Sequence, residues 1–216
     1  LFNSYKPEPT METIEIRKFI SPEILIGNNT RLLAANYIKG MNIKRLLLIT
    51  DKNIREISWF NDIAESLTNQ QIQFVIYDKI SPNSPDIEVM QGLEFYTENQ
   101  CTGILAIGGG SVLDSAKGIG VVYSNHKHIL NFEGVDKIRI PPPPLICIPT
   151  TSGTSSDVSQ FCIIRDLSRL VKIAIVSKSL VPDITLIDPL VTFTMNPHLT
   201  ACTGMDAMTH AVEIGR

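Results

Sequence analysis

Two residues near the carboxyl end of the chain, Asp206 and His210, have the chemistry and spacing of a metal-binding pair. The segment around them, residues 203–212, is typical of an α-helix, in which positions four apart lie on one face. A carboxylate oxygen and an imidazole nitrogen suit a borderline divalent cation such as Fe²⁺ or Zn²⁺. An ordinary Asp/His surface pair is the alternative, because two ligands alone do not hold such an ion firmly.

Two loops upstream have the composition of a phosphate-binding site. Gly108-Gly109-Gly110-Ser111 lies where a strand should end and a helix begin, a place where backbone N–H groups and the helix dipole favour an anion. The run from Pro149 to Thr154 offers hydroxyl donors on Thr150, Thr151, Ser152 and Thr154 after another apolar strand. Each loop alone is equally typical of a structural turn, and the third glycine of the usual dinucleotide fingerprint is replaced by Leu113. Together, at the carboxyl ends of strands, they favour a nucleotide cofactor.

Asp51 directly follows a third apolar run, residues 44–50. A carboxylate at the end of a strand can accept hydrogen bonds from the ribose hydroxyls of an adenosine, and it would repel a 2′-phosphate. This position therefore favours NAD over NADP. The alternative is an aspartate that only caps the next helix.

The elements that must position these residues alternate between apolar runs and segments with helical spacing. Strands are expected at 44–50, 72–77, 103–107, 145–148 and 184–187, and helices at 29–39, 59–70, 86–99 and 111–122. Residues 160–165 and 170–176 are expected to form a hairpin, and residues 13–19 and 23–26 an edge hairpin. This order predicts an α/β fold with a Rossmann-like parallel sheet flanked by helices.

A change of composition near residue 190 predicts two domains. Residues 1–190 are expected to form the α/β domain, and residues 191–216 the beginning of an all-helical domain. The net charge of −3 lacks the basic excess that nucleic-acid binding needs. No apolar run approaches the roughly 20 residues that span a bilayer, and no signal-peptide pattern is present, so a cytoplasmic protein is expected. The four cysteines are widely spaced, which predicts reduced thiols.

These segments, in this order, resemble the iron-containing (group III) alcohol dehydrogenase family. The resemblance runs from about Ile14 to Glu213 and is carried mainly by two motifs, Gly-Gly-Gly-Ser-x-x-Asp-x-x-Lys at residues 108–117 and Gly-Met-Asp-Ala-x-x-His-Ala at residues 204–211. Weaker matches are Thr50-Asp51-Lys52, Ser81-Pro82-Asn83 and the run from Ile148 to Thr154.

The resemblance implies a dehydroquinate synthase-like architecture, with an N-terminal NAD(P)-binding domain, a C-terminal helical metal-binding domain and the substrate between them. Asp206 and His210 would be metal ligands, and two further ligand histidines would follow Arg216. The residues implied to surround the cofactor are Asp51, Asn83, Gly109, Gly110, Ser111, Asp114, Thr150, Thr151, Thr154, Ile163 and Lys172.

The leading hypothesis is therefore an NAD-dependent, metal-dependent alcohol dehydrogenase that transfers hydride between a small alcohol or aldehyde and nicotinamide. Fe²⁺ is the expected metal, with Zn²⁺ as the alternative, and homodimerisation through an exposed N-terminal strand is expected. The alternatives are a catalytically incomplete nucleotide-binding fragment and a relative of dehydroquinate synthase or of the polyol dehydrogenases.

Overall fold

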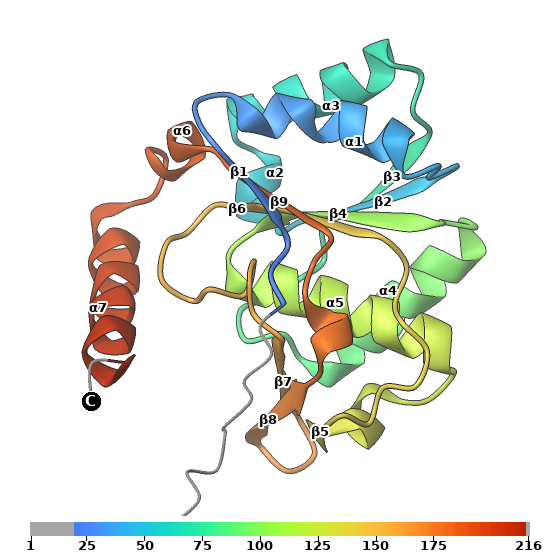
Figure 1. Cartoon of the computed structure of the whole chain (residues 1–216), viewed down its shortest axis with the longest axis vertical. Coiled ribbons are helices and arrows are strands. Elements are labelled where there is room, and N and C mark those ends of the chain that lie inside the picture. The colour runs from blue at the N-terminus through green and yellow to red at the C-terminus, as the bar shows by residue number, and fades with distance from the viewer. Residues whose placement is uncertain (1–19, 215–216) are drawn as a thin grey trace, which may run out of the picture.

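The computed structural model describes residues 20–214, which form a six-stranded sheet with helices on both faces (Figure 1). The strand order is β1-β9-β6-β4-β2-β3, and all neighbouring strands are parallel. The strands are β1 (Glu23–Ile26), β2 (Leu46–Ile49), β3 (Phe74–Tyr77), β4 (Gly103–Gly108), β6 (Leu145–Pro149) and β9 (Ile184–Ile187). The expected α/β fold with a parallel sheet is confirmed.

The helices follow the strands in the expected alternation. They are η1 (Thr30–Leu33), α1 (Ala34–Gly40), α2 (Lys52–Arg55), α3 (Ser58–Asn69), α4 (Asp86–Glu98) and α5 (Gly110–Asn125). One core cluster joins α1 and α3 to Leu46 and Leu48 of β2, and another joins α4 and α5 to Leu47 and Ile49 of the same strand. Because successive side chains of a strand point to opposite faces, a continuous apolar run such as β2 contributes to both clusters.

The carboxyl ends of four strands meet at one edge of the sheet. Ile49 of β2 pairs with Tyr77 of β3 and with Ala106 of β4, and β4 continues this register into β6. The next residue, Thr50, ties the edge together, because its N–H donates to the Tyr77 carbonyl at 3.0 Å and its Oγ1 donates to the Ile107 carbonyl at 2.8 Å. The loops that follow these strands therefore begin side by side.

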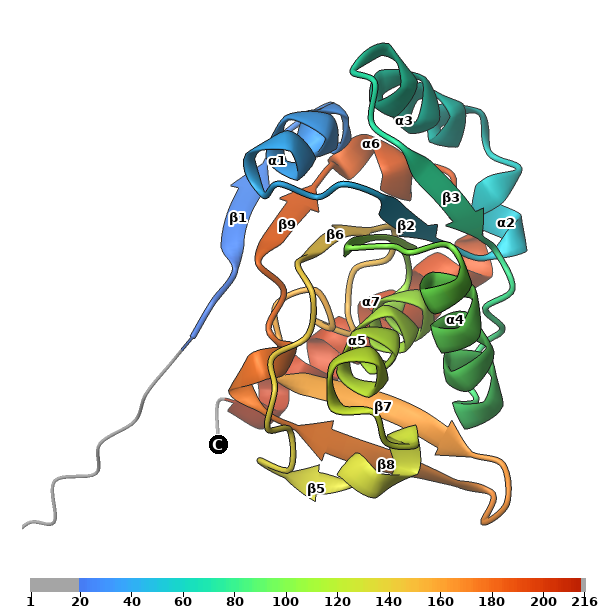
Figure 2. The same cartoon turned by 90° about the vertical axis from the view of Figure 1, so that its right-hand side faces the viewer.

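The expected hairpin at 160–165 and 170–176 is present, but it belongs to a second, separate sheet. β7 (Phe161–Asp166) and β8 (Val171–Val176) pair antiparallel, and the short β5 (Gly134–Val135) joins β8. Figure 2 shows this sheet on the side of α5 that faces away from the six-stranded sheet. Two 3-10 helices, η2 (Ile129–Phe132) and η3 (Lys178–Leu180), complete this part of the molecule.

The helix near the N-terminal end begins differently from the expectation. The helix expected at 29–39 begins as the 3-10 helix η1, because Asn29 is left-handed (φ 65°) and makes no side-chain cap. The buried guanidinium of Arg31 instead holds this turn through an ion pair of 2.7 Å with Asp188, which follows β9. β1 pairs in parallel with β9, whereas the hairpin partner expected at 13–19 lies outside the described residues.

The chain continues through α6 (Pro189–Thr192) into the long helix α7 (Pro197–Ile214), which agrees with the helical segment expected near the carboxyl end. Figure 1 shows α7 at the left, beside the loop between β6 and β7. Between residues 20 and 214, no helix is long and apolar enough to cross a membrane. Cys101, Cys147 and Cys162 are buried, Cys202 is exposed, and all four are free thiols, as expected.

Candidate functional site

A cleft of about 840 Å³ lies at the edge where the strands end, a volume in the usual range for small-molecule and cofactor sites. The segments after β2, β3, β4 and β6 form most of its wall, and Glu88 of α4 and two residues of α7 complete it. The predicted site residues that line it are Asp51, Gly109, Gly110, Ser111, Thr150, Thr151 and Thr154. The loops singled out in the sequence therefore share one concave surface.

The loop at residues 108–111 (the glycine loop) and the loop at residues 149–154 (the threonine loop) are in direct contact. A β-carbon on Gly109 would lie 3.2 Å from Thr151 Oγ1, and one on Gly110 would lie 3.0 Å from Thr154 Oγ1. The Thr150 N–H donates to the Gly108 carbonyl at 3.0 Å, which fixes the two loops at their base. A larger residue at either position would have to displace these threonine side chains by a few tenths of an ångström.

The N-terminus of α5 opens into this cleft. α5 has 16 residues, its N-cap is Gly109, and no side chain caps its first turn. The carbonyl of Gly109 accepts the N–H groups of Val112 and Leu113. The earlier N–H groups, together with the positive end of the helix dipole, are therefore available to an anion, as in known phosphate-binding helices.

Asn83 supports the glycine loop through its backbone. Its N–H donates to Ser111 Oγ at 3.0 Å, and the Ser84 hydroxyl donates to the Ser111 carbonyl at 2.6 Å. Both Asn83 (φ 70°) and Ser84 (φ 45°) are left-handed, which turns the chain after Pro82 toward α5. Ser81 and Pro82 line the cleft, whereas the exposed Asn83 does not.

Asp51 is positioned for both of the roles that the sequence left open, which are capping the next helix and facing a cofactor. Its Oδ1 accepts the Ile54 N–H at 3.0 Å and so caps α2, and the residue also lines the cleft. The cap occupies one carboxylate oxygen and leaves the other free to accept hydrogen bonds. Asp78, which follows the neighbouring strand β3, lines the same region and was not predicted.

Asp114, Ile163 and Lys172 do not line the cleft. Asp114 is buried below it, where Oδ2 accepts the Ile163 N–H at 3.1 Å and Oδ1 has no hydrogen-bond partner. Burial raises the pKa of this carboxyl to about 6, partly offset by the nearby Lys117 ammonium. Lys172 is exposed on β8 opposite Arg165. The structure thus connects Asp114 to β7, which carries Ile163, while a role toward a cofactor stays a prediction for all three.

The two predicted metal ligands lie together on α7. Asp206 Oδ1 is 3.6 Å from His210 Nε2, and both side chains are about half exposed. Two atoms that each bind one ion at about 2.1 Å lie roughly 3.0–3.4 Å apart, so the pair fits a shared cation after a small adjustment. Over residues 20–214, no group of three or more His, Cys, Asp or Glu side chains is arranged to hold a metal. The pair is therefore half of a typical donor set.

The remaining histidines do not complete this set. His198 lies on α7, but it is eight residues, or about two turns, before Asp206, and its Nε2 lies 3.7 Å from Cys202 Sγ. His126 is the C-cap of α5, so it lies about 24 Å along that helix from the end that opens into the cleft. His128 Nδ1 accepts the Leu130 N–H and caps η2.

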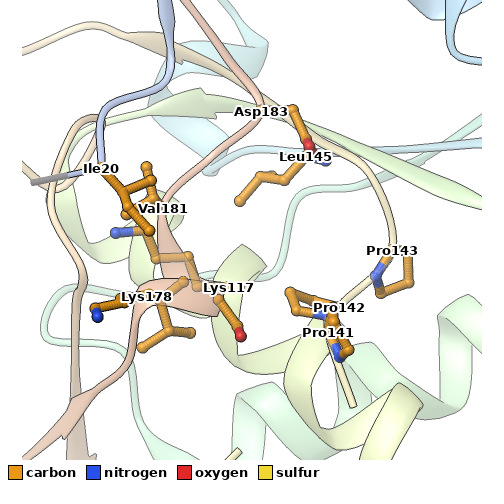
Figure 3. A pocket seen from close by; sticks show the side chains of 11 residues that line it. Ile20, Lys117, Pro141, Pro142, Pro143, Leu145, Lys178, Val181 and Asp183 are labelled. Atoms are coloured by element: carbon orange, nitrogen blue, oxygen red, sulfur yellow. Dashed lines mark hydrogen bonds between the residues drawn. The ribbon is translucent and has the colours of Figure 1, made fainter. Parts of the chain in front are cut away.

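A second, smaller cavity of about 360 Å³ is lined by Lys117 of α5 and by none of the predicted site residues (Figure 3). Two of its polar side chains, Lys117 and Asp183, are already engaged. Lys117 Nζ donates to the carbonyls of Ser159 (2.9 Å) and Phe161 (2.8 Å), and Asp183 Oδ2 accepts the Leu145 N–H at 2.8 Å. The larger cleft is therefore the candidate site.

Sequence reasoning missed the contribution of α7 to the cleft wall. Leu199 and Thr203 line the cleft, and Gly153 of the threonine loop lies directly against Thr203. The glycine inside a hydroxyl-rich loop was a usable signal, because such a glycine often marks a close backbone approach. Nothing local indicated which segment would approach it.

Known proteins resemble this chain over most of its length. The family model described as iron-containing alcohol dehydrogenase matches residues 21–189. Alcohol dehydrogenase 4 of Schizosaccharomyces pombe is 38% identical over 213 residues, which are 98% of this chain and 50% of that protein. The NAD-dependent methanol dehydrogenase of Bacillus methanolicus is 30% identical over 195 residues, which are 90% of this chain and 51% of that protein.

Among solved structures, a 1,3-propanediol oxidoreductase superposes with a TM-score of 0.89 at 32% identity and covers 92% of this chain and 52% of that chain. The chain therefore spans about half the length of the relatives that it matches. The match to the family model covers most of the chain and includes the cleft loops. The chain belongs to the iron-containing alcohol dehydrogenase family.

Proposed function

We propose that the cleft binds NAD and that the protein is the cofactor-binding part of an alcohol dehydrogenase that transfers hydride between a small alcohol or aldehyde and nicotinamide. One observation carries the proposal: the glycine loop and the threonine loop meet in one cleft, and the wall of this cleft also includes α7, the helix that carries Asp206 and His210. The proposal divides the chain into a cofactor-binding domain, residues 1–190, and the beginning of a metal-binding helical domain, residues 191–216.

In this proposal, the N–H groups at the start of α5 bind the pyrophosphate, and the hydroxyls of Thr151 and Thr154 donate to cofactor oxygens. The free oxygen of Asp51 accepts from the ribose hydroxyls. Its negative charge opposes a 2′-phosphate, which supports NAD over NADP. The close approach of Gly109 and Gly110 to the threonines brings the N–H groups at the start of α5 and the threonine hydroxyls together on one wall of the cleft.

Asp206 and His210 would hold a divalent metal, Fe²⁺ or Zn²⁺. Such an ion, when bound, acts as a Lewis acid that polarises the substrate oxygen and lowers the pKa of an alcohol. A catalytic site normally has at least three protein ligands, so tight binding needs donors beyond this pair. The exposed face of the pair is open to such donors.

A nucleotide-binding unit without turnover is the second candidate, and the two-donor metal site favours it for residues 20–214. The match to the iron-containing alcohol dehydrogenase model supports the dehydrogenase over a dehydroquinate synthase-type reaction. Cytoplasmic location and a homodimer stay predictions. The exposed Ile24 and Ile26 on the edge strand β1 support the dimer, and light scattering would measure it.

The test is a titration of the chain with NADH, followed by fluorescence, with and without Zn²⁺. We expect saturable NADH binding, and we expect Zn²⁺ to raise the melting temperature of the chain but not of a variant with Asp206→Asn and His210→Gln. The matched control is His198→Gln, which removes another exposed histidine of α7. Absence of NADH binding would contradict the proposal.

Turnover is measured separately, as NAD reduction with primary alcohols in the presence of Fe²⁺ or Zn²⁺. Metal-dependent reduction supports the dehydrogenase, and loss on chelation should accompany it. NADH binding without reduction supports the nucleotide-binding unit. Reduction that survives complete metal removal would contradict the metal role of the Asp206 and His210 pair.

A further inference from the structure

Gly153 makes a close approach to α7, the helix that carries Asp206 and His210 (the metal pair). A β-carbon on Gly153 would lie 2.5 Å from the Thr203 carbonyl oxygen and 3.3 Å from Asp206 Oδ2. Its φ of +143° is also a conformation that residues with a side chain rarely adopt. Only glycine therefore fits between the threonine loop and this turn of α7.

The same contact is where α7 meets the rest of the protein. Across residues 197–213, Thr203 and Asp206 are the two residues that are partly shielded from solvent, and the others are exposed. These two are the residues that face Gly153. The position of α7 against the cleft therefore depends on a small contact area centred on one glycine.

We propose that Gly153 is a positioning residue, which docks the turn of α7 that carries Asp206 onto the loop that holds the cofactor. A methyl group at residue 153 cannot be accommodated by a side-chain movement, because the nearest atom is a backbone oxygen. The loop and α7 must separate. Asp206 would then move away from Thr151 and Thr154, while the contacts of these two threonines with Gly109 and Gly110 would stay in place.

This inference rests on the proposed function, since it gives Gly153 the task of setting the distance between cofactor and metal pair. Hydride transfer requires near-contact of the reacting atoms, and a displacement of about 1 Å can lower a rate by roughly a hundredfold. The contact would therefore matter more for reaction geometry than for cofactor affinity.

The chain contains natural probes for the test. Trp59 is the single tryptophan. Cys202, which precedes Thr203, is exposed, whereas the other three cysteines are buried. Energy transfer from Trp59 to a fluorophore on Cys202 reports where α7 lies. The variant is Gly153→Ala, and the matched control is Gly204→Ala, because a β-carbon on Gly204 meets no atom within 4 Å.

We expect time-resolved transfer in the unsubstituted chain to give one narrow distance, and we expect Gly153→Ala to broaden and lengthen it while Gly204→Ala leaves it unchanged. The NADH dissociation constant of Gly153→Ala should rise by less than about tenfold, because most of the cleft wall is intact. Where the enzyme turns over, kcat should fall more than KM changes. A defect that only weakened folding would not produce this pattern.

Two outcomes would overturn the inference: a transfer distance in Gly153→Ala equal to that of the unsubstituted chain, or a broad distance distribution in the unsubstituted chain itself. The second measurement needs no variant, so it holds even if Gly153→Ala fails to fold. Failure of the unsubstituted chain to bind NADH would instead contradict the proposed function, and it leaves the docking of α7 measurable by the same energy transfer.

Discussion

Gly110 and Thr154, from loops 44 positions apart in the chain, approach so closely that a β-carbon on Gly110 would lie 3.0 Å from both Oγ1 and Cγ2 of Thr154. Gly110 is the first residue of α5, and its φ is not positive, so the backbone does not itself require glycine. The requirement comes from the facing loop. This distinguishes Gly110 from a glycine that serves only to turn the chain.

We predict that Gly110→Ala weakens NADH binding by about tenfold or more, because the added methyl group displaces the Thr154 side chain from the cleft. The free energy of unfolding should change little. The helix propensity of alanine exceeds that of glycine by up to about 1 kcal/mol, and this gain offsets the cost of displacing Thr154. NADH fluorescence titration and urea unfolding measure the two effects. Gly40→Ala is the control, because a β-carbon there meets no atom within 4 Å. Equal NADH affinity in both variants would show that the two loops do not hold the cofactor.

Asp51 can be divided into its two roles by substitution. Asn is as good an N-cap as Asp, so Asp51→Asn should keep α2 capped while removing the charge that opposes a 2′-phosphate. We expect this variant to bind NADPH more tightly relative to NADH, with an unchanged melting temperature. Asp51→Ala should shift the cofactor preference in the same direction and also lose about 1 kcal/mol of stability. An unchanged NADPH to NADH ratio in both variants would exclude Asp51 from the ribose site.

The raised pKa of Asp114 predicts a pH dependence of stability. Its folded-state pKa of about 6 lies above the ordinary 3.8, so between these pH values the folded state binds more protons than the unfolded state. The free energy of unfolding should therefore fall as pH rises from about 4 to about 6, by roughly 3 kcal/mol. Asp114→Asn keeps the acceptor for the Ile163 N–H and should flatten this part of the profile. Urea unfolding at several pH values measures it, and Asp136→Asn, which changes an exposed carboxylate, should leave the profile as it is.

Lys117 is buried, and its ammonium group donates to the carbonyls of Ser159 and Phe161, which connects α5 to the first residue of β7 and to the segment before it. Lys117→Met keeps the apolar stem but leaves two carbonyls without this donor, so we expect a loss of about 2–5 kcal/mol in the free energy of unfolding. The control is Lys178→Met, an exposed lysine that lines the same small cavity and should change stability by less than about 0.5 kcal/mol. Equal effects would mean that the Lys117 contacts contribute little.

Much of the secondary structure could be predicted from sequence because it depends on local patterns. The continuous apolar run of β2 could only be a strand buried on both faces, and the loops at Gly108 and Pro149 could be placed at strand ends from the runs before them. The i,i+4 spacing put Asp206 and His210 on one face of a helix, where they are 3.6 Å apart. Local patterns did not reveal that the first turn near Asn29 is a 3-10 helix, because its Arg31 pairs with the distant Asp188.

The sequence by itself determined the order of the elements, the chemistry of the cleft loops and the spacing of the metal pair, since each follows from residues close together in the chain. Only the tertiary structure decided which surfaces meet: that Thr154 faces Gly110, that Asp114 is bonded to β7 instead of lining the cleft, and that Gly153 seats α7. The physical reason is that these contacts join segments far apart in the chain, and their fit depends on backbone distances of a few tenths of an ångström that no local propensity encodes.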